Sequence, residues 1–130
     1  MRHRRLRVAV VDDEDNVRRA LGRFFRAAGY EVSTFGSGGD FLEAIIEESP
    51  DCAVLDLHLT GITGVEVLER LRQAGNRLPV VVVTGRLASG VTERALAAGA
   101  SACLRKPLDG DLLVRTLTAA VHRAERSSAV

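Results

Sequence analysis

The sequence PVVVVT at residues 79–84 is a short run rich in β-branched side chains, the composition of a strand buried on both faces of a sheet. Other short apolar runs recur along the chain, and each is followed by a longer segment whose apolar residues have helical spacing. The runs predict strands at residues 6–11, 30–35, 52–57, 79–84 and 101–105. The longer segments predict helices at about 17–28, 38–48, 64–74, 88–98 and 108–125.

Five strand–helix units with continuously apolar strands predict an α/β fold in which helices cover both faces of a parallel sheet. A mixed α+β fold is the alternative. With 130 residues, the chain has the size of one ordinary domain. We therefore expect a single domain over residues 1–130, with a basic tail at residues 1–5 and a frayed helix end at residues 126–130.

The composition argues against several other classes of protein. The 18 basic and 17 acidic residues nearly cancel, and the few aromatic residues include no Trp, so a dedicated nucleic-acid binder is not expected. Cys52 and Cys103 lack metal-site spacing, and we expect both to be buried free thiols of a cytoplasmic protein. No apolar run approaches the length of a membrane span, and the basic N-terminus is a poor signal peptide.

In open parallel sheets, ligands bind at the carboxyl ends of the strands. The residues that stand at or directly after the expected strand ends are Asp12, Asp13, Asp56, Thr84, Lys106 and Pro107. We expect them to converge at one edge of the sheet. The turn after the first strand contains neither GxGxxG nor a P-loop, so a nucleotide-phosphate loop is not expected there.

Asp56 carries the strongest chemical signal of this set, because a charge after a fully apolar strand is costly without a partner. Asp12 and Asp13 add repulsion, since like charges about 4 Å apart repel by about 4 kcal/mol at an effective dielectric of 20. A divalent cation with oxygen ligands, such as Mg²⁺, would relieve this repulsion. The ordinary alternatives are that Asp12 and Asp13 cap a helix and that Thr84 is a plain strand residue.

Lys106 is the single lysine of the chain, beside 17 arginines. A compact ammonium can reach one carboxylate and its phosphate without filling a pocket, whereas the arginine fork is larger and planar. A carboxylate nucleophile with Mg²⁺ and a cationic clamp fits phosphoryl transfer through an aspartyl phosphate. We expect Asp56 to be that nucleophile.

In this order of motifs, the chain resembles receiver domains of bacterial two-component response regulators. The resemblance spans essentially the whole chain and rests on Asp12-Asp13, Asp56 within VLDLHLTGITG, Thr84 within VVVTG, the AGA segment 98–100 and Lys106-Pro107. It implies a flavodoxin-like three-layer (βα)5 sandwich with the parallel strand order 2-1-3-4-5. It also implies a protein that catalyses its own phosphorylation and dephosphorylation and is not a conventional enzyme.

The resemblance implies a role for each acidic residue of the set. A sensor histidine kinase would be the partner that phosphorylates Asp56. Mg²⁺ would be held by Asp13, Asp56 and the backbone carbonyl of His58, with Asp12 acting through water.

The same resemblance implies how the phosphoryl group is handled. Lys106 would pair with Asp56 or its phosphate, Thr84 would move to hydrogen-bond the phosphoryl group, and the Lys106–Pro107 bond would be cis. Arg86 and His58 flank the site, and we expect them to shield the acyl phosphate and set its lifetime. The sequence leaves open whether the His58 side chain faces the site or turns away from it.

The motifs around Asp56 and Thr84 are closest to those of receivers that precede LuxR-type helix-turn-helix domains. They leave open whether a DNA-binding output domain lies outside these 130 residues or the receiver stands alone. We expect the readout surface, and a homodimer interface, on the face formed by the helix at 88–98, the strand at 101–105 and the helix at 108–125.

Two departures from the family pattern matter. Cys103 stands where the family commonly has an aromatic switch residue, and Thr60, Ile62 and Thr63 replace the usual Pro, Met and Asp of the loop after the phosphoacceptor. The missing aromatic favours, slightly, a phosphorylation-independent pseudo-receiver as the alternative function. A phosphatase of the haloacid dehalogenase type is a weaker alternative, because His58 replaces the second acid of its DxDxT motif.

Overall fold

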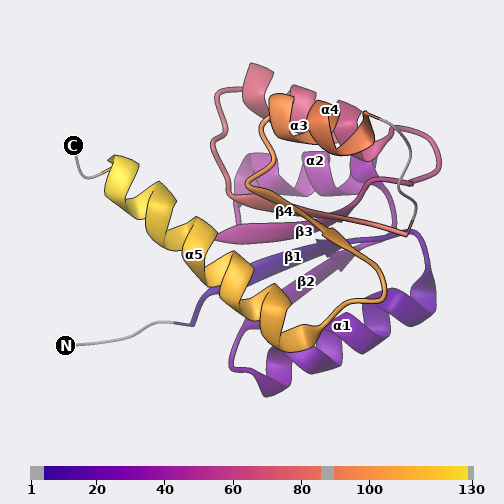
Figure 1. Cartoon of the computed structure of the whole chain (residues 1–130), viewed down its shortest axis with the longest axis vertical. Coiled ribbons are helices and arrows are strands. Elements are labelled where there is room, and N and C mark those ends of the chain that lie inside the picture. The colour runs from indigo at the N-terminus through magenta and orange to yellow at the C-terminus, as the bar shows by residue number, and fades with distance from the viewer. Residues whose placement is uncertain (1–4, 86–89, 129–130) are drawn as a thin grey trace.

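The structure, a computed structural model, describes residues 5–85 and 90–128 (Figure 1). The strands are β1 (Arg7–Val11), β2 (Glu31–Phe35), β3 (Cys52–Asp56), β4 (Val80–Thr84) and β5 (Ala102–Arg105). The helices are α1 (Asp15–Ala27), α2 (Gly38–Glu47), α3 (Gly64–Gln73), α4 (Val91–Ala97) and α5 (Gly110–Ser128). Strands and helices alternate along the chain, which confirms the sequence prediction.

The sheet is parallel throughout, and the strand order across it is β2-β1-β3-β4-β5. Helices α2, α3 and α4 cover one face, whereas α1 and α5 cover the other (Figure 1). This is the expected three-layer sandwich. The alternative of a mixed α+β fold is wrong for the described strands, since each of their pairings is parallel.

Two apolar cores hold the layers together, one on each face of the sheet. Phe41 and Leu68 belong to the core beneath α2, α3 and α4, and Phe25 and Leu117 to the core beneath α1 and α5; all four side chains are fully buried. Residues of β1, β3 and β4 point alternately into the two cores. Because both faces are buried, these strands are apolar along their whole length, which is why continuous runs such as 79–84 mark them.

The last helix differs at both ends from the predicted range 108–125. It begins at Gly110, because the Asp109 side chain accepts a hydrogen bond from the backbone N–H of Asp111 at 3.0 Å and thereby caps the helix. It continues to Ser128, so it includes part of the end that we expected to be frayed.

Parts of two further expectations lie outside the described residues. The helix predicted at 88–98 is described from Val91 onward, as α4. Residues 1–4 of the expected basic tail are likewise outside the described ranges. Within those ranges, no helix is both long enough and apolar enough to cross a membrane.

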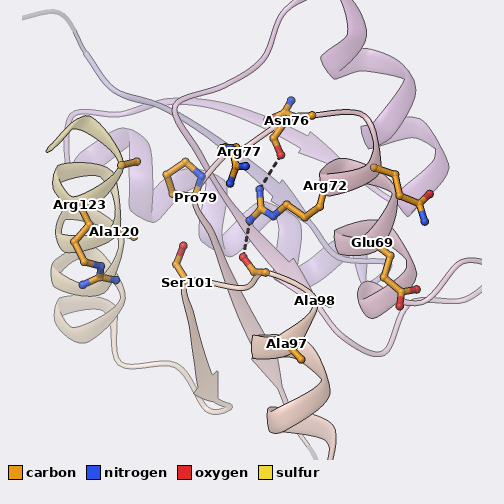
Figure 2. A pocket seen from close by; sticks show the side chains of 14 residues that line it. Glu69, Arg72, Asn76, Arg77, Pro79, Ala97, Ala98, Ser101, Ala120 and Arg123 are labelled. Carbon is orange, nitrogen blue, oxygen red and sulfur yellow. Dashed lines mark hydrogen bonds between the residues drawn. The ribbon is translucent and has the colours of Figure 1, made fainter. Parts of the chain in front are cut away.

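Arg72 of α3 joins two loops at the amino-terminal edge of the sheet (Figure 2). Its Nη1 donates to the backbone carbonyls of Asn76 at 2.9 Å and Leu78 at 3.0 Å, and its Nη2 donates to that of Gly99 at 2.5 Å. Burial, and after it the charge of Arg77, lowers the pKa of Arg72. Arg72 also lines a cavity of about 900 Å³, which lies at the opposite edge of the sheet from the strand ends that carry the acidic residues.

We predict that Arg72→Met lowers the free energy of unfolding by about 1.5–3 kcal/mol, the range for hydrogen bonds to a charged group, because all three carbonyls lose their donor. Urea unfolding measures this change. Arg77→Met, which removes an exposed guanidinium next to it, is the control and should change stability by less than about 0.5 kcal/mol. Equal losses in the two variants would contradict the role of the carbonyl contacts.

Candidate functional site

The register of the sheet brings the predicted site residues together. Val11 of β1 pairs with Leu55 of β3, so the next residue on each strand, Asp12 and Asp56, lie side by side. On the other side of β3, Thr84 is the last residue of β4 and pairs with Arg105 of β5. Lys106 follows directly, so it reaches the same edge.

Burial singles out the same residues. Within the described ranges, the polar or charged residues classed as buried are Asp12, Asp56 and Thr84, which are 1%, 4% and 1% exposed. All three stand at carboxyl ends of strands in the middle of the sheet. Burying such groups is unfavourable unless each has partners, and the partners form the rest of the site.

The two buried carboxylates are held in the same way. Asp12 Oδ1 accepts from the backbone N–H of Glu14 and Asp56 Oδ1 accepts from that of His58, each at 2.9 Å. Both are hydrogen bonds to the residue two positions on, the local turn that Asp favours. Each carboxylate is left with its Oδ2, and both of these oxygens lie near Lys106.

Lys106 bridges the pair. Its Nζ lies 3.2 Å from Asp12 Oδ2 and 3.4 Å from Asp56 Oδ2. Burial alone would lower the pKa of this ammonium, but the charges of Asp56 and Asp12 outweigh burial and raise the pKa of Lys106. The Lys106–Pro107 peptide bond is cis, as expected.

Among the described residues, the carboxylates of this cluster outnumber the ammonium groups that contact them. Carboxylate oxygens of Asp12, Asp13 and Asp56 all lie within 4.8 Å of one another, and one ammonium faces them. Burial is the main cause that raises the pKa of Asp12, and the charge of Asp56 raises it further against the opposing effect of Lys106. Asp13 is half-buried at the open side of the cluster. Three hard oxygen donors with surplus negative charge fit Mg²⁺.

His58 answers the question that the sequence left open. Its side chain is exposed on one side, yet its Nε2 lies 2.9 Å from the Thr84 hydroxyl, so the imidazole faces the site. The other residue expected to shield the site, Arg86, lies outside the described residues.

Thr60 is a neighbour of the site that the sequence reasoning missed. Its backbone N–H and its hydroxyl both donate to Asp13 Oδ2, at 3.2 and 3.3 Å. The sequence did carry a signal for this contact, namely the replacement of the usual proline of receiver domains by Thr60. A proline has neither a backbone N–H nor a hydroxyl and could not donate to Asp13. Thr60 therefore ties the loop after β3 to one of the carboxylates.

The expectation that both cysteines are buried is correct for Cys52 and wrong for Cys103. Both are free, but Cys103 is half-buried because β5 is an edge strand of the sheet. Its Sγ lies 3.8 Å from the Thr92 hydroxyl of α4. Burial raises the pKa of Cys52 to about 12, which makes this thiol unreactive.

Comparison with known proteins gives a consistent result. The family described as response regulator receiver domain matches residues 8–118. Nodulation protein W of Bradyrhizobium diazoefficiens is 34% identical over 116 residues, which are 89% of this chain and 51% of that protein. Transcriptional regulatory protein AfsQ1 of Streptomyces coelicolor is 35% identical over 119 residues, which are 92% of this chain and 52% of that protein.

The chain therefore spans about half the length of these curated relatives. Among solved structures, the low-resolution structure of response regulator StyR superposes with a TM-score of 0.87 at 35% identity. The match covers 97% of this chain and 64% of that one.

The raised pKa of Asp12 predicts a specific pH dependence. A carboxyl group whose pKa is raised in the folded state contributes stability that is present below its ordinary value and is lost as the pH rises through the raised value. In EDTA at neutral pH, we therefore expect Asp12→Asn to melt at a higher temperature than the wild type. The difference should shrink as the pH is lowered through the folded-state pKa of Asp12.

Thermal unfolding over a pH series, with EDTA and with Mg²⁺, measures this dependence. Mg²⁺ should stabilise the wild type more than Asp12→Asn, because the variant lacks one carboxylate charge. A wild type that is the more stable of the two at neutral pH in EDTA would contradict the account.

Proposed function

The chain belongs to the family of response regulator receiver domains, and on that basis we propose that it accepts a phosphoryl group on Asp56 and changes conformation in response. The observation that carries the proposal is the position of Asp56. Its buried carboxylate stands next to Asp12, within reach of Lys106 and at the open edge of the sheet. A buried charged group that faces a specific charge partner in an accessible site is typical of functional residues.

In the proposed reaction, a carboxylate oxygen of Asp56 attacks the phosphorus of a phosphohistidine on a sensor kinase. The oxygen–phosphorus bond forms as the phosphorus–nitrogen bond breaks, and the departing imidazole nitrogen keeps the electron pair and takes up a proton. Hydrolysis of the acyl phosphate by water then releases inorganic phosphate and restores the carboxylate. In this sense the domain catalyses both its own phosphorylation and its own dephosphorylation.

The residues of the site would have separate roles in this reaction. Asp12, Asp13 and Asp56 would hold Mg²⁺ together with the His58 backbone carbonyl, and the bound cation supplies positive charge against the transferring group. Lys106 already contacts Asp56, so its ammonium is in place to neutralise a phosphoryl oxygen. Burial of Asp56 restricts access to a donor that approaches from the open edge.

Thr84 would convert the chemical change into a conformational one. Phosphorylation adds a charge of roughly −1.5 to −2 and new acceptor oxygens near the end of β4. A hydrogen bond from the Thr84 hydroxyl to such an oxygen contributes about 1.5–3 kcal/mol, which shifts a two-state population by about ten- to a hundredfold. The segment after β4, including α4, would respond to the new position of the Thr84 hydroxyl.

We also propose that the domain serves a DNA-binding output domain and resides in the cytoplasm. The half-length match to a relative named as a transcriptional regulatory protein supports an output domain, and the motifs resemble receivers of the LuxR type. A homodimer through α4, β5 and α5 stays a prediction.

The alternative functions have less support. A phosphorylation-independent pseudo-receiver need not keep the full set of acids, hydroxyl and lysine, yet here all of them lie at one edge. For a phosphatase of the haloacid dehalogenase type, the second acid is missing, and His58 at that position binds Thr84.

The test is chemical modification of Asp56. With Mg²⁺ and acetyl phosphate, we expect the intact mass of the wild type to rise by one phosphoryl group, and peptide mapping to place it on Asp56. Asp56→Asn, which is nearly isosteric, should stay unmodified. A wild type without any phosphoryl adduct, or an adduct of equal yield in Asp56→Asn, would refute the proposal.

A further inference from the structure

His58 connects the two halves of the proposed switch. Its backbone N–H donates to Asp56 Oδ1, and its imidazole Nε2 lies 2.9 Å from the Thr84 hydroxyl, at the end of the neighbouring strand. One residue therefore contacts the carboxylate through its backbone and the hydroxyl through its side chain. Side-chain variants change the second contact while they leave the backbone groups of residue 58 in place.

We propose that His58 is a positioning residue that holds the Thr84 hydroxyl in its resting position, so that the imidazole–hydroxyl contact must break before Thr84 binds a phosphoryl oxygen. This inference rests on the proposed phosphorylation of Asp56. It assigns to the imidazole a role separate from that of the backbone carbonyl at the same residue.

The backbone around Thr84 limits how its hydroxyl can move. Thr84 is the last residue of β4, and its carbonyl accepts from the Lys106 N–H at 2.8 Å, while the preceding carbonyl, that of Val83, accepts from the Leu57 N–H at 3.0 Å. With the backbone held on both sides, the hydroxyl moves mainly by rotation about χ1 between three staggered positions. The hydroxyl has one proton, and while the imidazole accepts this proton the hydroxyl cannot donate it to a phosphoryl oxygen, so the two contacts exclude each other.

The energies decide the direction of the effect. A hydrogen bond from the Thr84 hydroxyl to a phosphoryl oxygen is charge-assisted, and such bonds are stronger than ordinary side-chain hydrogen bonds. Phosphorylation therefore still moves Thr84, but the cost of breaking the contact with His58 is subtracted from the free energy that biases the switch. Removing the imidazole should make the activated position easier to reach.

The experiment uses beryllofluoride with Mg²⁺, a stable analogue of the phosphoryl group, and ¹⁹F NMR to titrate its binding to the wild type and to His58 variants. We expect His58→Ala to lower the half-saturating concentration by about two- to tenfold, the range that one ordinary side-chain hydrogen bond supplies. His58→Gln places its side-chain amide near the Nε2 position and should remain close to the wild type. The shorter His58→Asn should behave like His58→Ala.

Two further measurements separate positioning from simple shielding of the site. In a Thr84→Ala background, His58→Ala should have no effect on beryllofluoride binding, since the contact acts through the hydroxyl. In ¹⁵N NMR of labelled histidine, the Nε2 signal of His58 should move when beryllofluoride binds, and it should move in the same direction in unliganded Thr84→Val.

Each contrary result has a definite meaning. An unchanged or raised half-saturating concentration in His58→Ala overturns the inference, and so does an effect that persists without the Thr84 hydroxyl. In both cases the wild type still binds beryllofluoride, so the proposed function stands. A wild type that binds no beryllofluoride and gains no phosphoryl group on Asp56 refutes the proposed function, and the inference with it.

Discussion

Two carboxylates, Asp12 and Asp56, are buried side by side at the ends of two adjacent central strands, and the rest of the site follows from this constraint. The fold cannot place these strands next to each other without placing the charges next to each other. Lys106 relieves part of the repulsion in the resting protein by contacting both carboxylates. The surplus negative charge that remains would attract a divalent cation, and that cation together with Lys106 would offset the charge of an incoming phosphoryl group.

Local structure positions each member of this cluster at small cost. The same two-residue turn fixes Oδ1 of both buried carboxylates and directs both Oδ2 atoms towards Lys106. At the start of α3, Gly64 has no side chain, and a Cβ there would lie 2.7 Å from the carbonyl oxygen of Asp56. The helix can therefore begin directly against the end of β3, which holds the loop that carries His58 and Thr60 close to the carboxylates.

Periodic features of the sequence were sufficient for the α/β class and for the expectation that the acidic residues meet at one edge, whereas the strand order came from the resemblance to receiver domains. Continuous apolar runs mark strands buried on two faces, and the residues that follow such runs must meet at one edge of a parallel sheet. The contacts of His58, Thr60 and Arg72 could not be predicted in this way. His58 and Thr60 lie in a loop, which has no periodic pattern. Arg72 donates to backbone carbonyls that lie outside its own helix, and any residue type offers such a carbonyl.

The range of α5 shows the same limit at a helix end. An apolar pattern begins before the helix does, and only the capping contact of Asp109 decides where the first turn starts. Cys103 is a related case, since its apolar neighbours suggested full burial although it lies on an edge strand. In both cases the sequence pattern does not show which other groups of the chain contact the residue.

The central claim is that Lys106 stabilises the fold because its ammonium offsets the repulsion between Asp12 and Asp56. A thermodynamic cycle on the free energy of unfolding in EDTA tests this claim most directly. Lys106→Met is measured in the wild type and in an Asp12→Asn/Asp56→Asn background. We predict that the substitution destabilises the wild type and has little effect in the neutral background, with a coupling of about 1 kcal/mol or more. The same loss in both backgrounds would contradict the account, because Lys106 would then contribute packing and not charge compensation.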